Sequence, residues 1–451
     1  MSELMAGTSA VVLETPIGAE MMGYGARTGT AASLHDPLHA RALYLASDSD
    51  LLLIECELCL LAPSQAEEIR ERVAAKTGVA RERILVGCIH THSGPETGLG
   101  ALLLGSELPD HVAPLLEAAT LAGVQAHANA AAARLGVGCA EAQIGRNRRR
   151  ADGPLDTEVL VIRVDRADGS PLSVLYLHGC HPTALGHDNL AYSADWPWAA
   201  GRAIQEGLPG CNPIFALGAH ADVDPRTRGL LDLAIPGQSV GVSFDQVEVL
   251  GREIGQAVVG AASAIQTRPE VAVAAGSSRV RIPIHQADLE RRRLDALAAL
   301  GLPPDSDAST GDLYRLEQER TADLPADQRR ERIAKVRLYL RDRTARRFAF
   351  GEEPEVEVQV LRIGDAHLLG LPLEPTVDVG LDWKRRLGGR HAAVVGIANG
   401  WLRYLPHSRN FEESFAEQKY EILQSTLVPE ASNRLLAEAE RLDRLLADGH
   451  A

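Results

Sequence analysis

Short apolar runs alternate with longer amphipathic stretches along the chain, and several of the apolar runs end on polar residues. The run LLLIECELCL, residues 51–60, is typical of a buried strand. It is followed by PSQAEEIRERVAAKTG, residues 63–78, which predicts a helix with a capping box at Ser64 and an end at Gly78. The next run, RILVGCI, predicts a strand that delivers His90. This alternation predicts an α/β fold with a mixed β-sheet core flanked by helices.

Four further apolar runs end on side chains that can carry chemistry. In chain order they lead to His181, to His220 with Asp222 and Asp224, to Glu374 after a hairpin that turns at Gly364, and to Tyr404. In open α/β sheets, the loops at the carboxyl ends of the strands converge while the strands hold them rigid. We therefore expect His90 and these later corners to share one site.

The spread of these corners bears on the domain organisation. They lie between residues 90 and 404, which favours a single domain over 1–451. The stretch 285–347 is dense in charge and in helix formers, and it predicts a charged helical insertion within that domain. The insertion is a solvated excursion, a lid over the site or an arm between copies of the chain, so a homo-oligomer is one expected assembly.

Composition and charge exclude several classes of partner. The formal charge is −15, which opposes binding to nucleic acid and to anionic membrane surfaces. The first residues show no signal-peptide pattern, and Glu55 and Glu57 interrupt the most apolar window, so we expect a cytoplasmic protein without membrane insertion. Six cysteines are too few for a disulfide scaffold, and Cys56 and Cys59 are expected to be buried thiols.

The sequence HTHSGPETG, which starts at His90, points to metal chemistry. It lacks the lysine and the glycine spacing of a phosphate-binding loop. Zinc prefers imidazole nitrogen and carboxylate oxygen, and a catalytic zinc site keeps a position open for water. Residues i and i+2 of an extended chain face the same side, so His90 and His92 can reach one pocket. One can bind the metal while the other handles protons, and the later His and Glu corners strengthen this interpretation.

Five motifs carry a resemblance to a known family. They are HTHSGP at 90–95, HP at 181–182, DVDP at 222–225, LPLEP at 371–375, and ANGWLRY with EESFAEQKYE at 398–421. In this order, and with the opening stretches ETPIGAEMMGYGAR and LHDPLHARAL, they resemble the catalytic domain of neutral ceramidases over about residues 10–425. The resemblance implies a zinc-dependent amidohydrolase that cleaves an N-acyl bond of a small-molecule substrate.

The resemblance also implies roles for particular residues. The implied zinc ligands are His90, His181, Glu374 and Tyr404, and the further implied site residues are His92, Arg148 and Tyr420. Arg148 lies in a run of arginines, for which a solvated basic turn is an equal alternative. The remaining nearby histidines are expected to be structural or to support the ligands: His178, His187 and His220.

Three features depart from the family. Asp224 stands where the family's Asp-Val-Ser-Pro motif has a serine, so a serine nucleophile is excluded at that position. The sequence has neither the immunoglobulin-like C-terminal domain nor the secretion signal of ceramidases. These departures favour a cytoplasmic relative that acts on a smaller or more polar amide.

We expect metal-assisted hydrolysis, in which zinc activates water and polarises the acyl oxygen. Asp224 or His92 accepts the proton, although Asp224 has an alternative role as a structural partner of Arg226. Arg148 and Tyr420 orient a substrate carboxylate or stabilise the oxyanion. The rival functions are a metal-dependent esterase, lactonase or acyl-transfer (biosynthetic) enzyme on the same scaffold, and a non-catalytic protein that binds a ligand in the same pocket.

Overall fold

The computed structural model describes most of the chain outside the predicted insertion. The described residues are 2–24, 27–104, 107–228, 241–284, 353–389, 391–414, 416 and 419–449, with short pieces between 298 and 328. The predicted insertion 285–347 lies almost entirely outside the described residues. Its helical character and the single-domain organisation therefore stay predictions.

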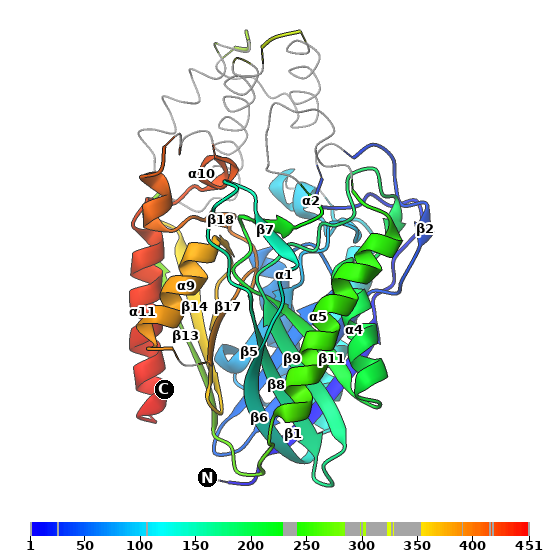
Figure 1. The fold of residues 1–451 in the computed structure, drawn as a ribbon, viewed down its shortest axis with the longest axis vertical. Helices are drawn as coiled ribbons and strands as arrows, with labels where there is room; N and C mark the ends of the chain where they lie inside the picture. The colour runs from blue at the N-terminus through cyan, green and yellow to red at the C-terminus, as the bar shows by residue number, and fades with distance from the viewer. Residues whose placement is uncertain are drawn as a thin grey trace.

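An eight-stranded mixed sheet forms the centre of the molecule (Figure 1). Its strand order is β11-β9-β8-β6-β1-β3-β4-β5, and only the outermost pairs, β11–β9 and β4–β5, are parallel. The strands are β1 (Met5–Val12), β3 (His39–Ala46), β4 (Asp50–Cys56), β5 (Ile84–Cys88), β6 (Ala131–Glu141), β8 (Glu158–Arg166), β9 (Pro171–His178) and β11 (Asn212–Leu217). The predicted α/β class with a mixed sheet is confirmed.

A second, four-stranded sheet packs against the first. Its order is β13-β14-β15-β17, with β13 (Val273–Arg281), β14 (Glu355–Ile363), β15 (Ala366–Gly370) and β17 (His391–Val395). The predicted hairpin is present between β14 and β15, where Gly364 adopts a φ of 58° that favours glycine. Short pairs join β2 (Ser33–Leu34) to β10 (Ala191–Tyr192), β7 (Gly145–Asn147) to β12 (Val223–Pro225), and β16 (Glu374–Pro375) to β18 (Tyr404–Leu405).

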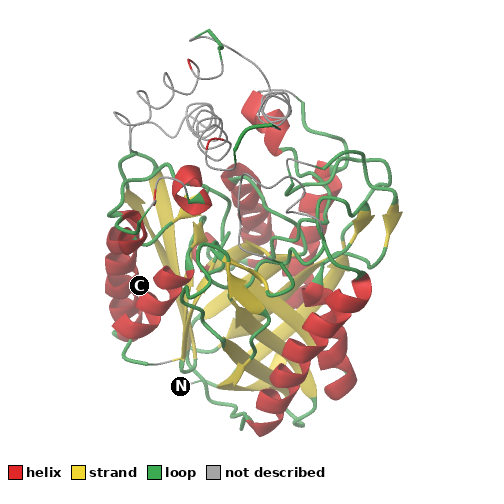
Figure 2. Ribbon diagram, turned by 45° about the horizontal axis from the view of Figure 1, so that its top comes forward, coloured by secondary structure: helices red, strands yellow, loops and turns green. Residues whose placement is uncertain are grey.

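Helices cover the outer faces of both sheets, as Figure 2 shows. The helix α3 (Val112–Ala128) packs on β1, β3 and β4 of the large sheet, and α1 (Pro63–Thr77) packs on α3 and β5. The helices α4 (Trp196–Gly207) and α5 (Phe244–Ala264) pack together on the other half of the sheet. The helices α9 (Val377–Arg386) and α11 (Ala431–Ala447) cover the smaller sheet. The remaining helical elements are short: η1 (Arg81–Arg83), α2 (Leu99–Leu104), η2 (Ser408–Phe411) and α10 (Tyr420–Gln424).

The start of α1 differs from the sequence prediction. Its N-cap is Ala62, and the capping box is closed by Gln65, whose side chain accepts the backbone N–H of Ala62 at 2.8 Å. Pro63 lies in the first turn, where its missing N–H costs nothing. The capping box predicted at Ser64 is therefore wrong, whereas the predicted end at Gly78 is confirmed by its left-handed φ of 79°.

The large sheet is buried on both faces, which explains its continuous apolar runs. On β3, Ala42 and Tyr44 pack with the core under α1 and α3, while Leu43 and Leu45 pack with strands of the smaller sheet. The segment after β17 ties the two edges of the large sheet together. The N–H of Gly396 donates to Leu217 O of β11 at 2.9 Å, and the N–H of Asn399 donates to Val86 O of β5 at 2.7 Å. The strand ends that carry the predicted site residues meet around this segment.

Candidate metal centre

Four side chains meet where the strand ends converge. They are His90, His181, His220 and Glu374, and their ligand atoms all lie within 4.8 Å of one another. None of the four is more than 3% exposed. Glu374 Oε2 lies 3.5 Å from His90 Nε2, 3.7 Å from His181 Nε2 and 3.8 Å from His220 Nε2. Ligand atoms of a tetrahedral zinc ion lie roughly 3.3–3.6 Å apart, so these separations are close to those of a metal site.

The backbone fixes the orientation of all three imidazoles. The Nδ1 atoms of His90, His181 and His220 lie against the carbonyl oxygens of Cys59, Val223 and Gly218, at 2.8, 3.1 and 2.8 Å. A ring that donates its Nδ1–H to a carbonyl keeps a lone pair on Nε2. The Nε2 atom of each ring lies toward Glu374. Metal-bound histidines usually have their other ring nitrogen held in this way.

Two atoms at the centre of this group have no hydrogen-bond partner among the described residues. They are Glu374 Oε2 and His220 Nε2. The other carboxylate oxygen, Oε1, accepts the indole N–H of Trp401 at 2.7 Å. Burying polar atoms without partners costs free energy, and a cation between them removes that cost. The residues present therefore fit a metal ion.

The charges of the group favour a cation as well. Burial opposes ionisation of Glu374, but His90, His181 and His220 hold its pKa well below the usual range. Burial and the neighbouring His181 and His90 lower the pKa of His220 well below its ordinary value, so this ring is neutral. Burial also acts against protonation of His90, yet Cys59 and Glu374 raise its pKa well above its usual value. A place that favours a protonated imidazole favours positive charge.

The loop after β5 presents His90 and His92 in an unusual conformation. His90 has a φ of 66°, a left-handed backbone that is uncommon for residues other than glycine, and its N–H donates to Leu58 O at 2.9 Å. His92 Nε2 lies 3.2 Å from His90 Nε2. Gly23 packs directly on the ring of His92, since a Cβ atom at this position would come within 2.4 Å of the ring. Both predicted histidines therefore face the group, as expected from their spacing.

Glu374 and Tyr404 are paired neighbours in the parallel bridge between β16 and β18. Tyr404 is buried, and burial together with Glu374 and Tyr420 raises its pKa well above the usual value. Its ring lies 5.4 Å from the ring of Tyr420, at the start of α10. Both predicted tyrosines thus lie at the edge of the group, on the side of Glu374.

Asp224 and Arg148 form a buried ion pair. Arg148 Nη1 donates to Asp224 Oδ1 at 3.2 Å, and Arg148 Nε donates to Glu421 Oε1 at 2.8 Å. The Arg148 guanidinium lies 5.1 Å from the centre of the Tyr420 ring. Burial raises the pKa of Asp224, but Arg148 and His181 outweigh it and leave the pKa below its ordinary value. Asp224 therefore carries a negative charge.

Two alternatives considered from the sequence are wrong. Arg148 is only 7% exposed, so it does not belong to a solvated basic turn. Arg226 does not pair with Asp224, because its guanidinium donates twice to Glu253, at 2.9 and 2.7 Å. Asp224 instead approaches the cluster from behind one ligand, with its Oδ1 atom 3.7 Å from His181 Nδ1.

The structure also adds residues that the sequence interpretation assigned elsewhere or missed. His220, expected to be structural or supporting, lies in the cluster itself, and the signal was its place directly after a strand. His178 lies outside the group and faces the carbonyl of Glu158 at 3.2 Å. Glu421 and Trp401 lie within the quoted motifs ANGWLRY and EESFAEQKYE, but no role was assigned to them, since their roles depend on long-range contacts. Cys59 is buried as predicted, with its sulfur 3.4 Å from His90 Nδ1.

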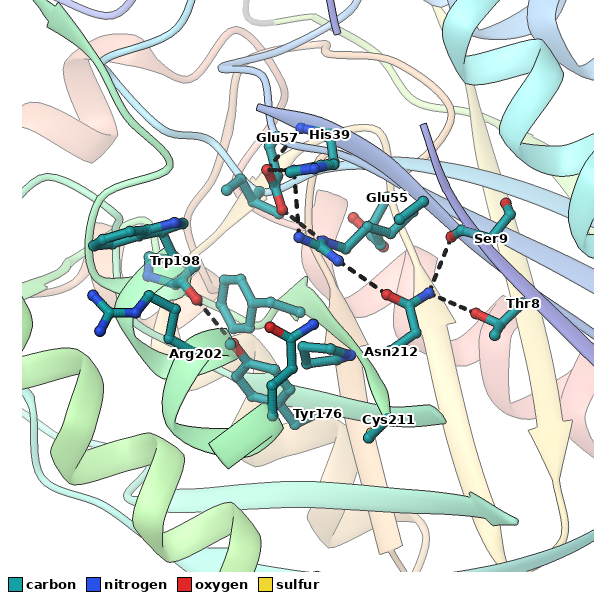
Figure 3. Close-up of a pocket in the computed structure, with 18 of the residues that line it drawn as sticks. Thr8, Ser9, His39, Glu55, Glu57, Tyr176, Trp198, Arg202, Cys211 and Asn212 are labelled. Carbon is teal, nitrogen blue, oxygen red and sulfur yellow. Dashed lines mark hydrogen bonds and ion pairs between the residues drawn. The ribbon is translucent and has the colours of Figure 1, made fainter. Parts of the chain in front are cut away.

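A cavity of about 610 Å³ lies elsewhere in the molecule (Figure 3). None of the four clustered residues lines it. Its polar side chains bond to one another: Arg41 donates to Glu57 at 2.7 Å and to Asn212 at 2.9 Å, Asn212 donates to Thr8 at 2.6 Å, and Glu57 accepts the N–H of His39 at 2.7 Å. Arg41, Glu57 and Asn212 are therefore paired within the protein, whereas the clustered histidines and Glu374 face one another, so we place the candidate site at the metal-binding group.

No protein-family model matches the sequence. A neutral ceramidase of Mycobacterium tuberculosis is 26% identical over 469 residues, which cover 89% of this chain and 70% of that protein. The chain resembles the neutral ceramidases. The neutral ceramidase of Pseudomonas aeruginosa superimposes with a TM-score of 0.68 at 20% identity, over 99% of this chain and 75% of that chain. A ceramidase structure described as complexed with C2 gives a TM-score of 0.70 at 18% identity, over 99% and 76%.

These comparisons confirm the resemblance predicted from the ordered motifs, and the fold is the one found in neutral ceramidases. The described residues contain no helix that is long and apolar enough to span a membrane. The cytoplasmic location expected from the sequence stays a prediction.

Proposed function

We propose that the protein is a zinc-dependent hydrolase that cleaves the amide bond of a small N-acyl compound. The observation that carries this proposal is the arrangement of three imidazole Nε2 atoms around one oxygen of a buried carboxylate, at 3.5, 3.7 and 3.8 Å. The similarity to neutral ceramidases supports the same reaction class, since ceramide is an N-acyl compound.

The donor set fits zinc because zinc is bound by imidazole nitrogen and carboxylate oxygen. His90, His181 and Glu374 would hold the ion. His220 presents a fourth donor atom, while the hydroxyl of Tyr404 lies beside Glu374 as the family resemblance requires. When bound, zinc polarises the acyl oxygen and makes water acidic enough to lose a proton near neutral pH.

His92 is the better placed of the two candidate proton acceptors. Its Nε2 atom lies on the donor side of the group, 3.2 Å from His90 Nε2. Burial, with the neighbouring His90 and His181, lowers the pKa of His92 well below its ordinary value, so the imidazole is neutral and has a nitrogen that can accept a proton. In this scheme His92 takes one proton from water as the oxygen bonds to the acyl carbon, and returns it to the nitrogen as the C–N bond breaks.

Asp224 then acts on its neighbours rather than on water. Its carboxylate is held by Arg148, and it reaches the cluster only at the Nδ1 side of His181. Arg148 keeps one buried nitrogen, Nη2, without a partner among the described residues. This N–H group is available to an oxygen of the substrate or to the oxyanion, and Asp224 and Glu421 fix the direction in which it points.

The replacement of a serine by Asp224 keeps a second candidate function open. A carboxylate paired with arginine cannot donate a hydrogen bond as a hydroxyl does, so the chemistry at this position differs from that of the family it resembles. A metal-dependent esterase, lactonase or acyl-transfer enzyme on the same scaffold accommodates this difference. All of these reactions act on an acyl carbon and use the same metal-binding group.

The test is hydrolysis of a panel of N-acyl amines and matching esters by the zinc-loaded protein. We expect free amine to be released from short or polar N-acyl compounds, with activity lost on chelation and restored by zinc. Ester cleavage without any amine release would move the assignment to the second candidate function. Activity that survives complete removal of the metal would contradict both.

A further inference from the structure

His92 lies beside the buried cluster and is more exposed than the four clustered residues. The four clustered residues are at most 3% exposed, whereas His92 is only half-buried. The ring of Tyr24 stands edge-on to the ring of His92, with 4.6 Å between the ring centres. The residues around Tyr24 are therefore direct neighbours of the candidate proton acceptor His92.

Two guanidinium groups flank Tyr24. Arg228 lies 5.6 Å and Arg27 lies 5.1 Å from the centre of the tyrosine ring. No carboxylate of the described residues lies within 4.0 Å of either group, so this wall of the site carries two positive charges without a direct ion-pair partner. Asp224 and Asp195 act on Arg228 electrostatically, and Asp224 is already paired with Arg148.

The two arginines use their N–H groups differently. Arg27 donates from Nε, Nη1 and Nη2 to the carbonyl oxygens of Asn189, Met22 and His92, at 3.2, 3.1 and 2.7 Å. It therefore joins three loops and has little left to offer a ligand. Among the described residues, the side-chain hydrogen bonds of Arg228 leave from Nη1 alone, to the Tyr24 hydroxyl at 2.7 Å and to Thr183 O at 2.6 Å.

We infer that Arg228 recognises a carboxylate on the substrate, so that the preferred substrates are N-acyl compounds that carry a free carboxylate, such as N-acyl amino acids. This inference rests on the proposed function, because it names the substrate class of that same site. Two bonds through Nη1 fix the plane of the guanidinium, and the Nε–Nη2 edge matches the two oxygens of a carboxylate. Arg27 adds positive charge to the same wall without competing for the ligand.

Arg226 provides a matched control two residues away. Its guanidinium is more exposed than that of Arg228 and pairs with Glu253 through both Nη atoms, so it has no reason to bind substrate. A variant of Arg226 changes the net charge by the same amount as a variant of Arg228. Any difference between the two variants then reports the position of the charge.

The experiment compares N-butyrylglycine with N-butyrylglycinamide, which differ only in the carboxylate. Binding of both is measured by calorimetry on the metal-free protein, and kcat and KM are measured on the zinc-loaded protein. We expect the wild type to bind the acid about 10- to 100-fold more tightly, as a charge-assisted bidentate contact typically provides. Arg228→Gln should lose this preference mainly through KM, Arg228→Lys should restore part of it, and Arg226→Gln should keep it.

Each outcome separates the inference from the proposed function. Equal affinity of the wild type for the two compounds, or an unchanged preference in Arg228→Gln, overturns the role of Arg228 even if both amides are cleaved. Preferential binding of the acid that depends on Arg228 supports the inference even if neither amide is cleaved, in which case the proposed hydrolysis is what fails.

Discussion

The polar side chains of the Figure 3 cavity and those of the metal-binding group differ in how their hydrogen-bonding atoms are paired. In the cavity of Figure 3, Arg41, Glu57 and Asn212 bond to one another and to the strands around them. In the metal-binding group, the Nδ1 atoms of three imidazoles contact backbone carbonyl oxygens, and their Nε2 atoms lie toward Glu374. Buried polar atoms that face one another without hydrogen-bond donors are stabilised by a bound cation, whereas Arg41, Glu57 and Asn212 are already paired.

The largest expected effect comes from removing a clustered histidine. His90→Ala and His181→Ala should each weaken zinc binding by well over 10²-fold, because even changes to residues behind a ligand cost about 10- to 100-fold. The purified wild type should hold about one zinc per chain, a stoichiometry expected for a single cluster of this kind. Metal content by atomic emission and circular dichroism on the same samples check the binding and the fold. His178→Ala, a histidine outside the group, is the control, and full occupancy in both test variants would defeat the assignment.

The next effect separates the two candidate proton acceptors. His92→Gln should lower kcat by about 10²- to 10⁴-fold while zinc stays bound, since this is the usual contribution of general acid–base catalysis. Asp224→Asn should lower kcat by less, because asparagine still offers Arg148 an oxygen. Steady-state kinetics on any N-acyl compound that the wild type cleaves decide the order. A larger loss in Asp224→Asn than in His92→Gln would return the proton transfer to Asp224.

A substitution in the network of Arg41, Glu57 and Asn212 should lower the stability of the protein without changing its affinity for zinc. Glu57→Gln removes the charge that pairs with Arg41, and we expect the free energy of unfolding to fall by about 1–3 kcal/mol, less than for a fully buried pair because both side chains keep some exposure. Urea unfolding and zinc affinity are measured side by side. A loss of zinc affinity without a loss of stability would show that the two groups are not independent.

Glu55 sharpens the comparison, because it lines the same cavity yet neither carboxyl oxygen has a partner. Burial raises the pKa of Glu55 well above the ordinary value of 4.5, so its partner is a proton. Because the pKa is raised, the contribution of the protonated Glu55 carboxyl to the free energy of unfolding is complete below pH 4.5. It is lost as the pH rises through the pKa of the folded state. The Glu55→Gln variant has no such pH-dependent loss of stability, because glutamine does not ionise.

The expected result is a gain in stability of Glu55→Gln over the wild type that grows with pH, by at most about 1.4 kcal/mol per pH unit. Thermal or urea unfolding of both proteins between pH 4 and 9 measures it. A constant difference across this range would mean that the carboxyl titrates at the same pH in the folded and the unfolded protein, so that its pKa is not raised by folding.

The sequence predicted the elements well, because apolar runs that end on polar residues mark strand ends wherever they occur. It also predicted that the corners would meet, but for a reason that does not hold. The expectation relied on the carboxyl ends of the strands lying together, whereas the pairings make β5 and β11 run in opposite directions within the sheet. The ends meet because the segment after β17 bonds to both edges, and local periodicity carries no information about such a tie.

The residues that the sequence missed share a physical reason. Glu421 binds Arg148 across 273 positions, and Trp401 binds Glu374 through a single indole N–H. Neither contact leaves a spacing or a composition signal. His220 did end a strand, yet a lone histidine is more often structural, and only its distance to the other three residues shows the group.

The most direct test of the central claim is an anomalous difference map from crystals of the zinc-loaded protein, collected on either side of the zinc absorption edge. We expect one strong peak per chain, located between the Nε2 atoms of His90, His181 and His220 and Oε2 of Glu374. A zinc peak elsewhere, or full zinc binding in solution with no peak among these four atoms, would contradict it.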